Sequence, residues 1–229
     1  MEFCQVEVSV SYLKAEEVSG NQVLFPGTLT NAAWYIRGLY RRSAYDHRPF
    51  LPAGIPDYYH TEEFRIGYAA FKREVAAVLQ PKSIVEIGVG IGVSALAFLD
   101  GAPNATYFGI DNDCESNRDF PVTPSEFVGN YLGHRGKIWK KDSTKIDRLP
   151  AGDLIHIDGS HEYDVAYLDT LLAWRSEFKW ILVDDARDSV VSAAVFEALR
   201  RKASGSVDWA YFEDTWTGNL LISRVKERP

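Results

Sequence analysis

The sequence is poor in cysteine, with two among 229 residues, Cys4 and Cys114. The two lie in unrelated contexts, so neither a disulfide framework nor a thiolate metal site is predicted. The chain also lacks an apolar run of about 20 residues, the length that spans a bilayer. Its first residues have neither the basic start nor the apolar stretch of a signal peptide. We therefore expect a soluble, cytoplasmic protein with no membrane partner.

Long runs of Lys or Arg are missing as well, and the formal net charge is -7. An acidic balance argues against a nucleic-acid backbone as the main partner. The composition is otherwise that of a globular protein, with 46% hydrophobic and 25% charged residues. The length suits one domain, or one domain with an added cap, and is enough to bury a substantial core.

Residues 1–79 show little sheet pattern. One short alternation of residues predicts a half-buried strand, which would be an edge partner of the sheet or a contact within a homo-oligomer. The residues on its buried face are Val6, Val8, Val10 and Tyr12. An amphipathic helix is predicted to start near Thr30, with one apolar face: Ala32, Ile36, Leu39 and Tyr40. A second helix is predicted to start at Thr61, with an apolar repeat: Phe64, Tyr68, Phe71, Val75 and Val78.

We expect residues 1–79 to form a mobile helical cap over a substrate site. The cap is rich in aromatic residues, which suit a flat or sugar-like small molecule. Alternatively, half of them only pack the cap onto the sheet. These aromatic residues are Trp34, Tyr35, Tyr40, Tyr45, Tyr58 and Tyr59.

From residue 80 to residue 229, short apolar strands alternate with helices. The predicted strands are 83–87, 106–110, 137–139, 153–157 and 180–183, and the clearest helices are 162–174 and 189–201. Near-continuous apolar strands separated by helices indicate a parallel sheet covered on both faces. Two final strands, 207–212 and 219–223, are typical of an antiparallel hairpin. The expected fold class is α/β, with a doubly wound, Rossmann-like and mostly parallel sheet.

The sharpest motif is a strand that runs into a glycine-rich turn and then a helix, Glu86-Ile87-Gly88-Val89-Gly90-Ile91-Gly92. Glycines there let the backbone approach a ligand closely, and a helix start favours negative charge. A dinucleotide fingerprint would need glycine or alanine in place of Val93, and no P-loop sequence is present. With this Glu-x-Gly-x-Gly-x-Gly motif the sequence resembles the class I methyltransferases, which use S-adenosylmethionine. The resemblance implies that the three glycines line the methionine moiety and that Glu86 helps to fix its amino group.

Two further acids follow the next predicted strands. Asp111 ends the second strand, about 20 residues beyond the glycine turn, where a carboxylate can accept hydrogen bonds from ribose hydroxyls. A turn or cap residue is the alternative interpretation of Asp111. Asp142 follows the third strand, and the resemblance implies that it binds the adenine amino group, with the backbone amide of Ser143 on the ring. An ordinary helix cap is the alternative for Asp142.

Acidic residues also follow the fourth and fifth strands, Asp158 after one, Asp184 and Asp185 after the other. Open α/β sheets hold their ligands at these strand ends. Three carboxylates that converge without an obvious basic partner repel one another, and a divalent cation would relieve that repulsion. Oxygen ligands suit Mg²⁺, Mn²⁺ or Ca²⁺ rather than zinc. Alternatively, Asp158 and Asp185 only cap the following helices.

The sequence Ile-His-Ile-Asp-Gly-Ser-His-Glu-Tyr at 155–163, followed by Val-Asp-Asp at 183–185, resembles metal-dependent small-molecule O-methyltransferases. It is similar to the macrocin O-methyltransferase type and, more distantly, to catechol O-methyltransferase. The resemblance implies three ligands for Mg²⁺ or a similar cation: Asp158, Asp184 and Asp185. It also implies that His161 is the catalytic base, whereas outside this family His161 would be a surface or capping residue. His156 is expected to be a hydrogen-bonded core histidine.

The expected reaction is transfer of a methyl group from S-adenosylmethionine to a hydroxyl of a small molecule of natural-product, sugar or phenolic type. The metal would lower the pKa of that hydroxyl, and His161, with a reference pKa of about 6.5, would remove its proton. Three alternatives stay open: a metal-independent methyltransferase, a nicotinamide-dependent oxidoreductase, and a catalytically silent cofactor-binding subunit. Val93 and the Glu86 motif count against the oxidoreductase.

Overall fold

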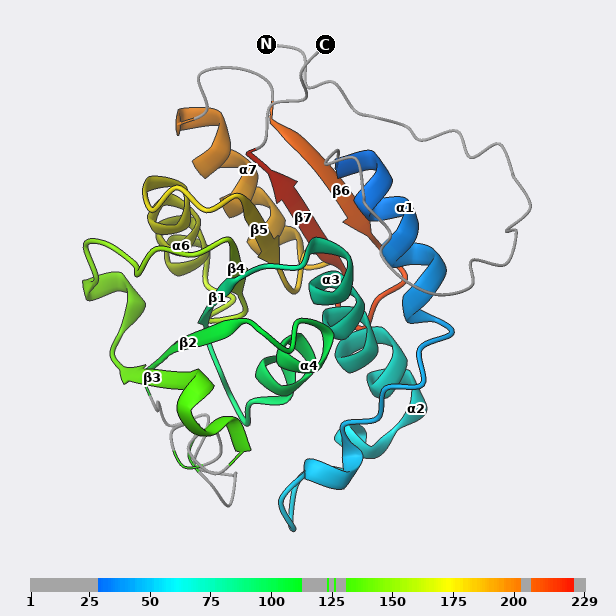
Figure 1. Ribbon diagram of the computed structural model, residues 1–229. Coiled ribbons are helices and arrows are strands. Elements are labelled where there is room, and N and C mark those ends of the chain that lie inside the picture. Colours follow the sequence, from blue (N-terminus) through cyan, green and yellow to red (C-terminus); the bar gives the residue numbers. More distant parts are fainter. Residues whose placement is uncertain (1–28, 113–122, 124–125, 127–130, 203–206, 225–229) are drawn as a thin grey trace.

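A seven-stranded sheet runs through the middle of the computed structural model, in the order β3-β2-β1-β4-β5-β7-β6 (Figure 1). The structure describes residues 29–112, 123, 126, 131–202 and 207–224. The strands are β1 (Ser83–Ile87), β2 (Thr106–Asp111), β3 (Gly136–Lys140), β4 (Leu154–Ile157), β5 (Trp180–Val183), β6 (Asp208–Phe212) and β7 (Asn219–Ser223). β1 to β5 are parallel, and β7 pairs antiparallel with β5 and β6. The predicted parallel sheet with a closing hairpin is confirmed; the strand predicted at Val6 to Tyr12 lies outside the described residues.

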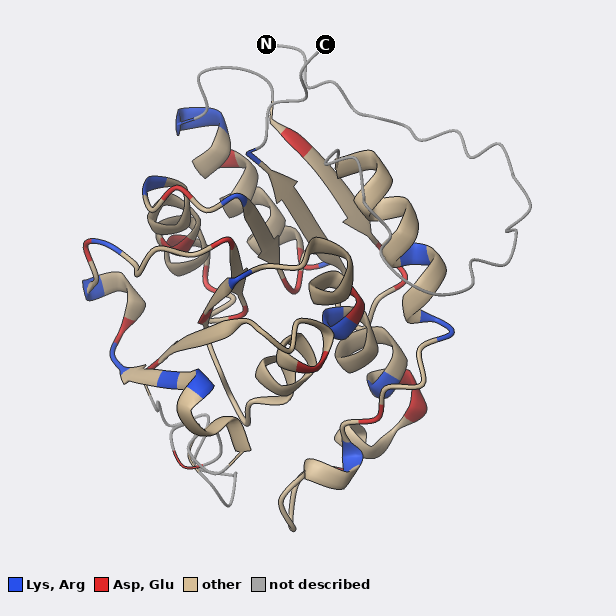
Figure 2. Cartoon of the chain, viewed as in Figure 1, with Lys and Arg blue, Asp and Glu red and all other residues tan. Residues whose placement is uncertain are grey.

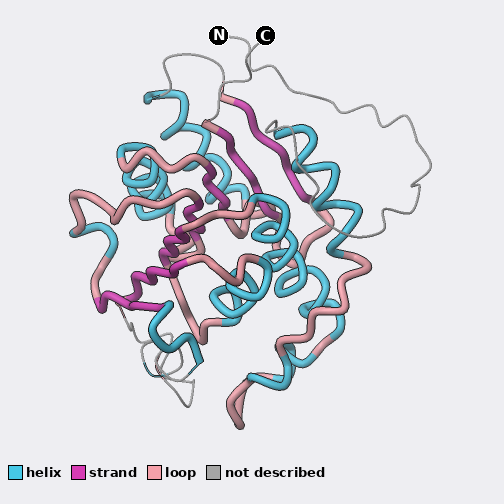
Figure 3. The backbone as a smooth tube through the Cα atoms, viewed as in Figure 1, coloured by secondary structure: helices cyan, strands magenta, loops and turns pink. Residues whose placement is uncertain are grey.

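Helices cover both faces of this sheet (Figure 3). The α-helices are α1 (Leu29–Tyr40), α2 (Glu62–Phe64), α3 (Phe71–Leu79), α4 (Val93–Gly101), α6 (Tyr163–Arg175) and α7 (Ser189–Lys202). Successive strand residues point to opposite faces. Ile84 and Leu154 therefore pack with α1, α3 and α4, whereas Val85 and Ile155 pack with α6 and α7. Burial on both faces explains why these strands are near-continuous apolar runs.

The register of the sheet aligns the strand ends that carry the predicted site. The last residues of β1, β4 and β5 are paired with one another in the parallel ladder. The residues that follow these strands, Gly88, Asp158 and Asp184, therefore emerge at the same edge of the sheet. This edge is where ligands bind in open α/β folds.

The helix predicted from Thr61 starts there, because Thr61 Oγ1 accepts the backbone N–H of Phe64 at 3.2 Å. It is not a continuous α-helix, since a π-helical turn, Arg65–Ala70, separates α2 from α3. Within this turn the carbonyl of Gly67 accepts the backbone N–H of Trp216 at 3.0 Å. Such turns are frequent at functional sites. This one, which the sequence did not predict, ties the β6–β7 connection to the N-terminal helices.

The helices predicted as a cap contribute to the main core. On α1, Ala32, Ile36 and Tyr40 are buried as predicted, whereas Leu39 is 39% exposed, so its assignment to the buried face was wrong. The buried side of α1 belongs to the same hydrophobic cluster as α3, α4 and the sheet. The division at residue 79 between a cap and a sheet domain stays a prediction.

The described helices include none with the length and apolarity of a membrane span. Figure 2 shows Lys and Arg spread over helices, strands and loops on several sides of the ribbon.

Candidate functional site

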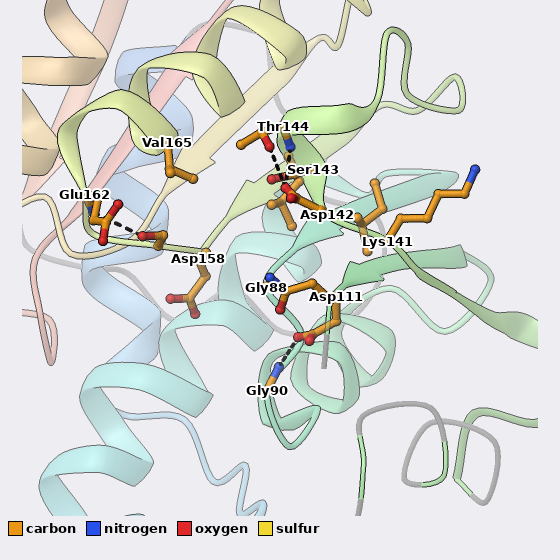
Figure 4. Close-up of a pocket in the computed structure, with 15 residues that line it drawn as sticks. Gly88, Gly90, Asp111, Lys141, Asp142, Ser143, Thr144, Asp158, Glu162 and Val165 are labelled. Carbon is orange, nitrogen blue, oxygen red and sulfur yellow. Dashed lines mark hydrogen bonds between the residues drawn. The ribbon is translucent and has the colours of Figure 1, made fainter. Parts of the chain in front are cut away.

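A cavity of about 480 Å³ lies at the carboxyl ends of the central strands, and we call it the glycine-loop cavity. Figure 4 shows Gly88, Gly90 and Asp111 on one side of it, and Asp142 and Ser143 on another. The predicted site residues that line it are Gly88, Gly90, Asp111, Asp142, Ser143 and Asp158. The structure thus brings together six predicted residues. Five of them were assigned to S-adenosylmethionine, and Asp158 was assigned to a metal ion.

Two glycines shape the wall of this cavity. Gly88 has a φ of +82°, and a Cβ there would lie 1.9 Å from the carbonyl oxygen of Asp158. Gly88 therefore permits the close approach of the loops after β1 and β4. Gly90 has a φ of +54°, but an added Cβ would have no heavy atom within 4 Å. Gly90 thus faces open space, where a ligand can approach the backbone.

The two acids predicted to hold the nucleoside both line the cavity. Asp111 is 7% exposed, and its Oδ2 accepts the backbone N–H groups of Val89 at 2.8 Å and Gly90 at 3.1 Å. Asp111 therefore also fixes the glycine loop. Asp142 Oδ1 accepts the backbone N–H of Thr144 at 3.0 Å, at the start of a short 3-10 turn. The capping alternative is confirmed for Asp142, and it does not remove the side chain from the cavity wall.

Glu86 and Gly92 are not among the residues that line the glycine-loop cavity. The carboxylate of Glu86 is buried, and it accepts hydrogen bonds from the hydroxyls of Ser94 and Tyr107. It also contacts Nδ1 of His156 at 2.6 Å. His156 is fully buried, which confirms that it is a hydrogen-bonded core histidine. A contact between Glu86 and the methionine amino group stays a prediction.

A second cavity of about 340 Å³ adjoins the first, and we call it the aromatic cavity. The two cavities share Gly88, Gly90 and Asp158. The aromatic cavity is also lined by five aromatic side chains and by three further predicted site residues: Tyr58, Tyr59, Phe64, Tyr68, Trp216, His161, Asp184 and Asp185. Ligands bound in the two cavities would therefore lie next to each other at Asp158 and the glycine loop.

The aromatic wall only partly matches the prediction. Tyr58 and Tyr59 line the cavity as expected, whereas Tyr40 is buried in the core beside Phe71. The sequence had not assigned Trp216 to this wall. Its ring lies within 13° of parallel to the ring of Tyr58, with centroids 6.4 Å apart. Trp216 reaches this place because the β6–β7 connection is tied to the π-helical turn.

Asp184 has a basic partner, contrary to the expectation that the acids would have none. Lys72 Nζ donates to Asp184 Oδ2 at 2.6 Å, and both side chains are almost completely buried. Asp184 Oδ1 accepts the hydroxyl of Thr217 at 2.5 Å and the backbone N–H of Asp185 at 2.9 Å. Although burial raises the pKa of Asp184, the ammonium of Lys72 holds this pKa below its usual value. Both carboxylate oxygens are therefore occupied by protein donors.

Asp158 lies between the two cavities and is under electrostatic strain. Its Oδ2 accepts the hydroxyl of Tyr68 at 2.7 Å. Burial, followed by the nearby charge of Asp184, raises the pKa of Asp158 from 3.8 to about 7. Because both effects penalise the ionised form, a positive charge beside Asp158 would be stabilising.

Replacing Asp158 with asparagine is expected to raise the melting temperature at pH 8 and to raise it much less near pH 5. The raised pKa means that the folded protein holds this proton more tightly than the unfolded chain, so the free energy of unfolding falls as pH rises from about 4 to about 7. Asparagine removes this loss of stability, because it carries no charge. Each kcal/mol of unfolding free energy that is recovered raises the melting temperature by about 2–4 °C. Thermal unfolding in a chelator measures the shift. Asp142→Asn, which alters a more exposed carboxylate, should not raise the melting temperature, and equal shifts of Asp158→Asn at both pH values would contradict the assignment.

His161 forms an ion pair with Asp185, with Nε2 2.8 Å from Oδ2. The hydrogen bond to Asp185 raises the pKa of His161 to about 9, and burial opposes this only in part. The expectation that His161 would titrate near its reference value was therefore wrong. Above pH 9 the imidazole is neutral and can accept a proton, and Asp185 then holds its orientation.

A divalent cation would find three donors at this end of the aromatic cavity. Ligand atoms of Asp158, His161 and Asp185 lie within 4.8 Å of one another, and carboxylate and imidazole donors suit several divalent metals. The set implied by the sequence fits less well, because Asp184 is hydrogen-bonded by Lys72 and Thr217.

Comparison with known proteins finds similarity to methyltransferases. Residues 85–186 match the protein family described as "Methyltransferase domain". The structure is similar to SAH-bound methyltransferase PaMTH1 from Podospora anserina, with a TM-score of 0.52, 17% identity, and 87% of this chain and 88% of that chain covered. It is also similar to the O-methyltransferase TomG from Streptomyces achromogenes, involved in tomaymycin synthesis and solved in complex with SAM, with a TM-score of 0.50, 14% identity, and coverage of 77% and 85%. A search of curated proteins found no match. Residues 85–186 are therefore similar to the methyltransferase family, and the chain has the fold of these methyltransferase structures.

Proposed function

We propose that this chain transfers the methyl group of S-adenosylmethionine to a hydroxyl group of a small organic acceptor. The observation that carries the proposal is the junction of two cavities at Gly88, Gly90 and Asp158. One cavity has the glycine turn and acids that suit the cofactor, and the other has aromatic walls and a His–Asp pair. Displacement at a methyl carbon needs donor and acceptor in line, so adjoining cavities suit this reaction.

S-adenosylmethionine would occupy the glycine-loop cavity. Two similar structures were solved with SAM or SAH, which supports this cofactor. Asp111 would accept hydrogen bonds from the ribose hydroxyls, because its carboxylate lines the cavity beside the glycine loop. The open space in front of Gly90 would take the methionine end.

Two alanine substitutions in the glycine loop are expected to separate folding from cofactor binding. Gly88→Ala should lower the free energy of unfolding by about 3 kcal/mol or more, because the methyl group meets the backbone of Asp158 at a positive φ. Gly90→Ala should lower the free energy of unfolding by only about 1–2 kcal/mol, because the added methyl group meets no other atom and only the positive φ is unfavourable. It should nevertheless weaken S-adenosylmethionine binding, because its methyl group fills the cavity. Chemical unfolding and calorimetric titration measure both effects, and equal stability losses would argue against this geometry.

The acceptor would occupy the aromatic cavity, which is lined in part by Tyr58, Tyr59 and Trp216. Such a wall suits a small molecule with a flat or sugar-like body. A hydroxyl must lose its proton as it becomes a nucleophile. His161 is placed to accept that proton in its neutral form, with Asp185 holding the ring at 2.8 Å.

Assistance by a divalent cation such as Mg²⁺ is a second form of this proposal. It is favoured by the donor atoms of Asp158, His161 and Asp185, which lie within 4.8 Å of one another. A cation held there would supply Lewis acidity that lowers the pKa of the acceptor hydroxyl. In that form His161 would be a ligand of the cation rather than the base, and it would no longer be paired with Asp185 alone.

A screen of methyl transfer tests both forms. Catechols, phenolic acids and glycosylated antibiotics would be offered with S-adenosylmethionine, in Mg²⁺ and in excess chelator, and methyl ethers would be detected by mass spectrometry. We expect a methylated product from at least one of these acceptor classes. Unchanged turnover in chelator supports the metal-free form, and its loss with cofactor binding intact supports the metal-assisted form. Cofactor binding without methylation of any acceptor would instead indicate a silent binding subunit.

A further inference from the structure

The ammonium group of Lys72 lies buried behind the acids of the aromatic cavity. The side chain of Lys72 is fully buried, and Nζ donates to Asp184 Oδ2 at 2.6 Å and to Asn219 Oδ1 at 3.1 Å. Lys72 comes from the start of α3, directly after the π-helical turn. A lysine is rarely buried unless it is paired, so this position is an unusual place for one.

The same ammonium is linked to Asp158. Nζ lies 4.1 Å from the centroid of the Tyr68 ring, within range of a cation–π interaction. The hydroxyl of Tyr68 donates to Asp158 Oδ2 at 2.7 Å. Lys72 thus contacts the acid after β5 directly and the acid after β4 through one aromatic side chain. This is the region where the converging carboxylates led us to expect a metal ion.

A metal bound to Asp184 would have to displace protein donors. Oδ2 is taken by Lys72, and Oδ1 by Thr217 and the backbone of Asp185. Moving Lys72 aside would leave its ammonium buried without its carboxylate, which is strongly unfavourable. Asp184 is therefore not available as a metal ligand while Lys72 is in place.

We infer that Lys72 is the permanent cation of the acceptor site and takes the place of a divalent metal at Asp184. Lys72 does not line the aromatic cavity, so it is a positioning residue that acts through Asp184 and, by way of Tyr68, through Asp158. The inference rests on the proposed function and favours its metal-free form. It adds that one substitution should convert the site into a metal site.

The test compares the wild type, Lys72→Met and the double variant Lys72→Met/Asp184→Asn by calorimetric titration with Mn²⁺. Methionine keeps an unbranched side chain but removes the charge. We expect Lys72→Met to bind Mn²⁺ on the order of tenfold or more tightly than the wild type, because Asp184 becomes a ligand. The double variant removes that ligand and should return to the weak binding of the wild type. Equal Mn²⁺ affinity in the wild type and Lys72→Met would overturn the inference.

Stability and turnover give two further readouts. Lys72→Met should melt at a lower temperature than the wild type, and Asp184→Asn should restore the loss, because a buried charge is then no longer left unpaired. Once an acceptor substrate is identified, the wild type should keep its kcat in excess chelator. The kcat of Lys72→Met should fall on the order of 10²-fold and recover with Mn²⁺. Loss of wild-type turnover in chelator would overturn the inference.

Two controls keep the result interpretable. If Lys72→Met does not fold, the Mn²⁺ affinity of the single variant Asp184→Asn tests the inference. An affinity equal to that of the wild type supports the inference, and a loss of about tenfold or more contradicts it. The titrations need no turnover, so they remain informative if no acceptor is methylated. Failure of the proposed function is thereby distinguished from failure of the role of Lys72.

Discussion

Replacing His161 with alanine is expected to lower kcat by about 10²–10⁴-fold, the range typical of a lost general base. His161 lines the aromatic cavity and is absent from the walls of the glycine-loop cavity. The affinity for S-adenosylmethionine should therefore hardly change. Steady-state kinetics and calorimetric titration separate the two effects. His134→Ala, which alters an exposed histidine before β3, is the matched control and should keep the wild-type kcat.

The pH profile gives the same prediction a second measurement. With the pKa of His161 raised to about 9, kcat of the wild type should increase with pH until about 9, because only the neutral imidazole accepts a proton. Asp185→Asn removes the main cause of the raised pKa, so the rising limb should move to lower pH. In His161→Ala the limb should disappear. Wild-type kcat in His161→Ala would place the base elsewhere.

Replacing Asp111 with alanine is expected to weaken S-adenosylmethionine binding by about 10²-fold. The change removes the acceptor for the ribose hydroxyls and also leaves the N–H groups of Val89 and Gly90 without their charged partner. Hydrogen bonds to charged groups contribute about 1.5–3 kcal/mol each, and a tenfold loss is about 1.4 kcal/mol. Calorimetric titration measures the loss directly.

Asp142→Ala is the matched control for Asp111→Ala, because it removes a carboxylate from the opposite wall of the same cavity. Asp142 already caps a turn through Thr144 and forms an ion pair with Lys145. A smaller loss, of about tenfold or less, is therefore expected. If both variants lose the same affinity, the special role of Asp111 is wrong.

Much of the fold could be predicted because its signals are local. The strand predicted at 180–183 is β5 as observed, and the helix predicted at 189–201 ends one residue later in the structure. Strands buried on both faces are apolar throughout, and parallel strands end at one edge, so Asp158 and Asp184 were expected together. The register of β4 with β5 places them there.

The partner of Asp184 could not be predicted, because Lys72 is 112 residues away in the sequence. Its neighbours Phe71 and Val75 belong to an apolar helical repeat, and a lysine within such a repeat is normally assigned to the solvent side. The π-helical turn before it has no sequence signal of its own. Contacts of this kind depend on how two layers pack, and local periodicity does not carry that information. His161 was identified through a resemblance, but its pKa depends on Asp185 across the sheet edge.

Calorimetric titration of the wild type with S-adenosylmethionine, and in parallel with NADH, tests the central claim most directly. The glycine loop, Asp111 and the shared cavity walls predict saturable binding of S-adenosylmethionine at one site per chain and no measurable binding of NADH. Tight binding of NADH without binding of S-adenosylmethionine would contradict the assignment.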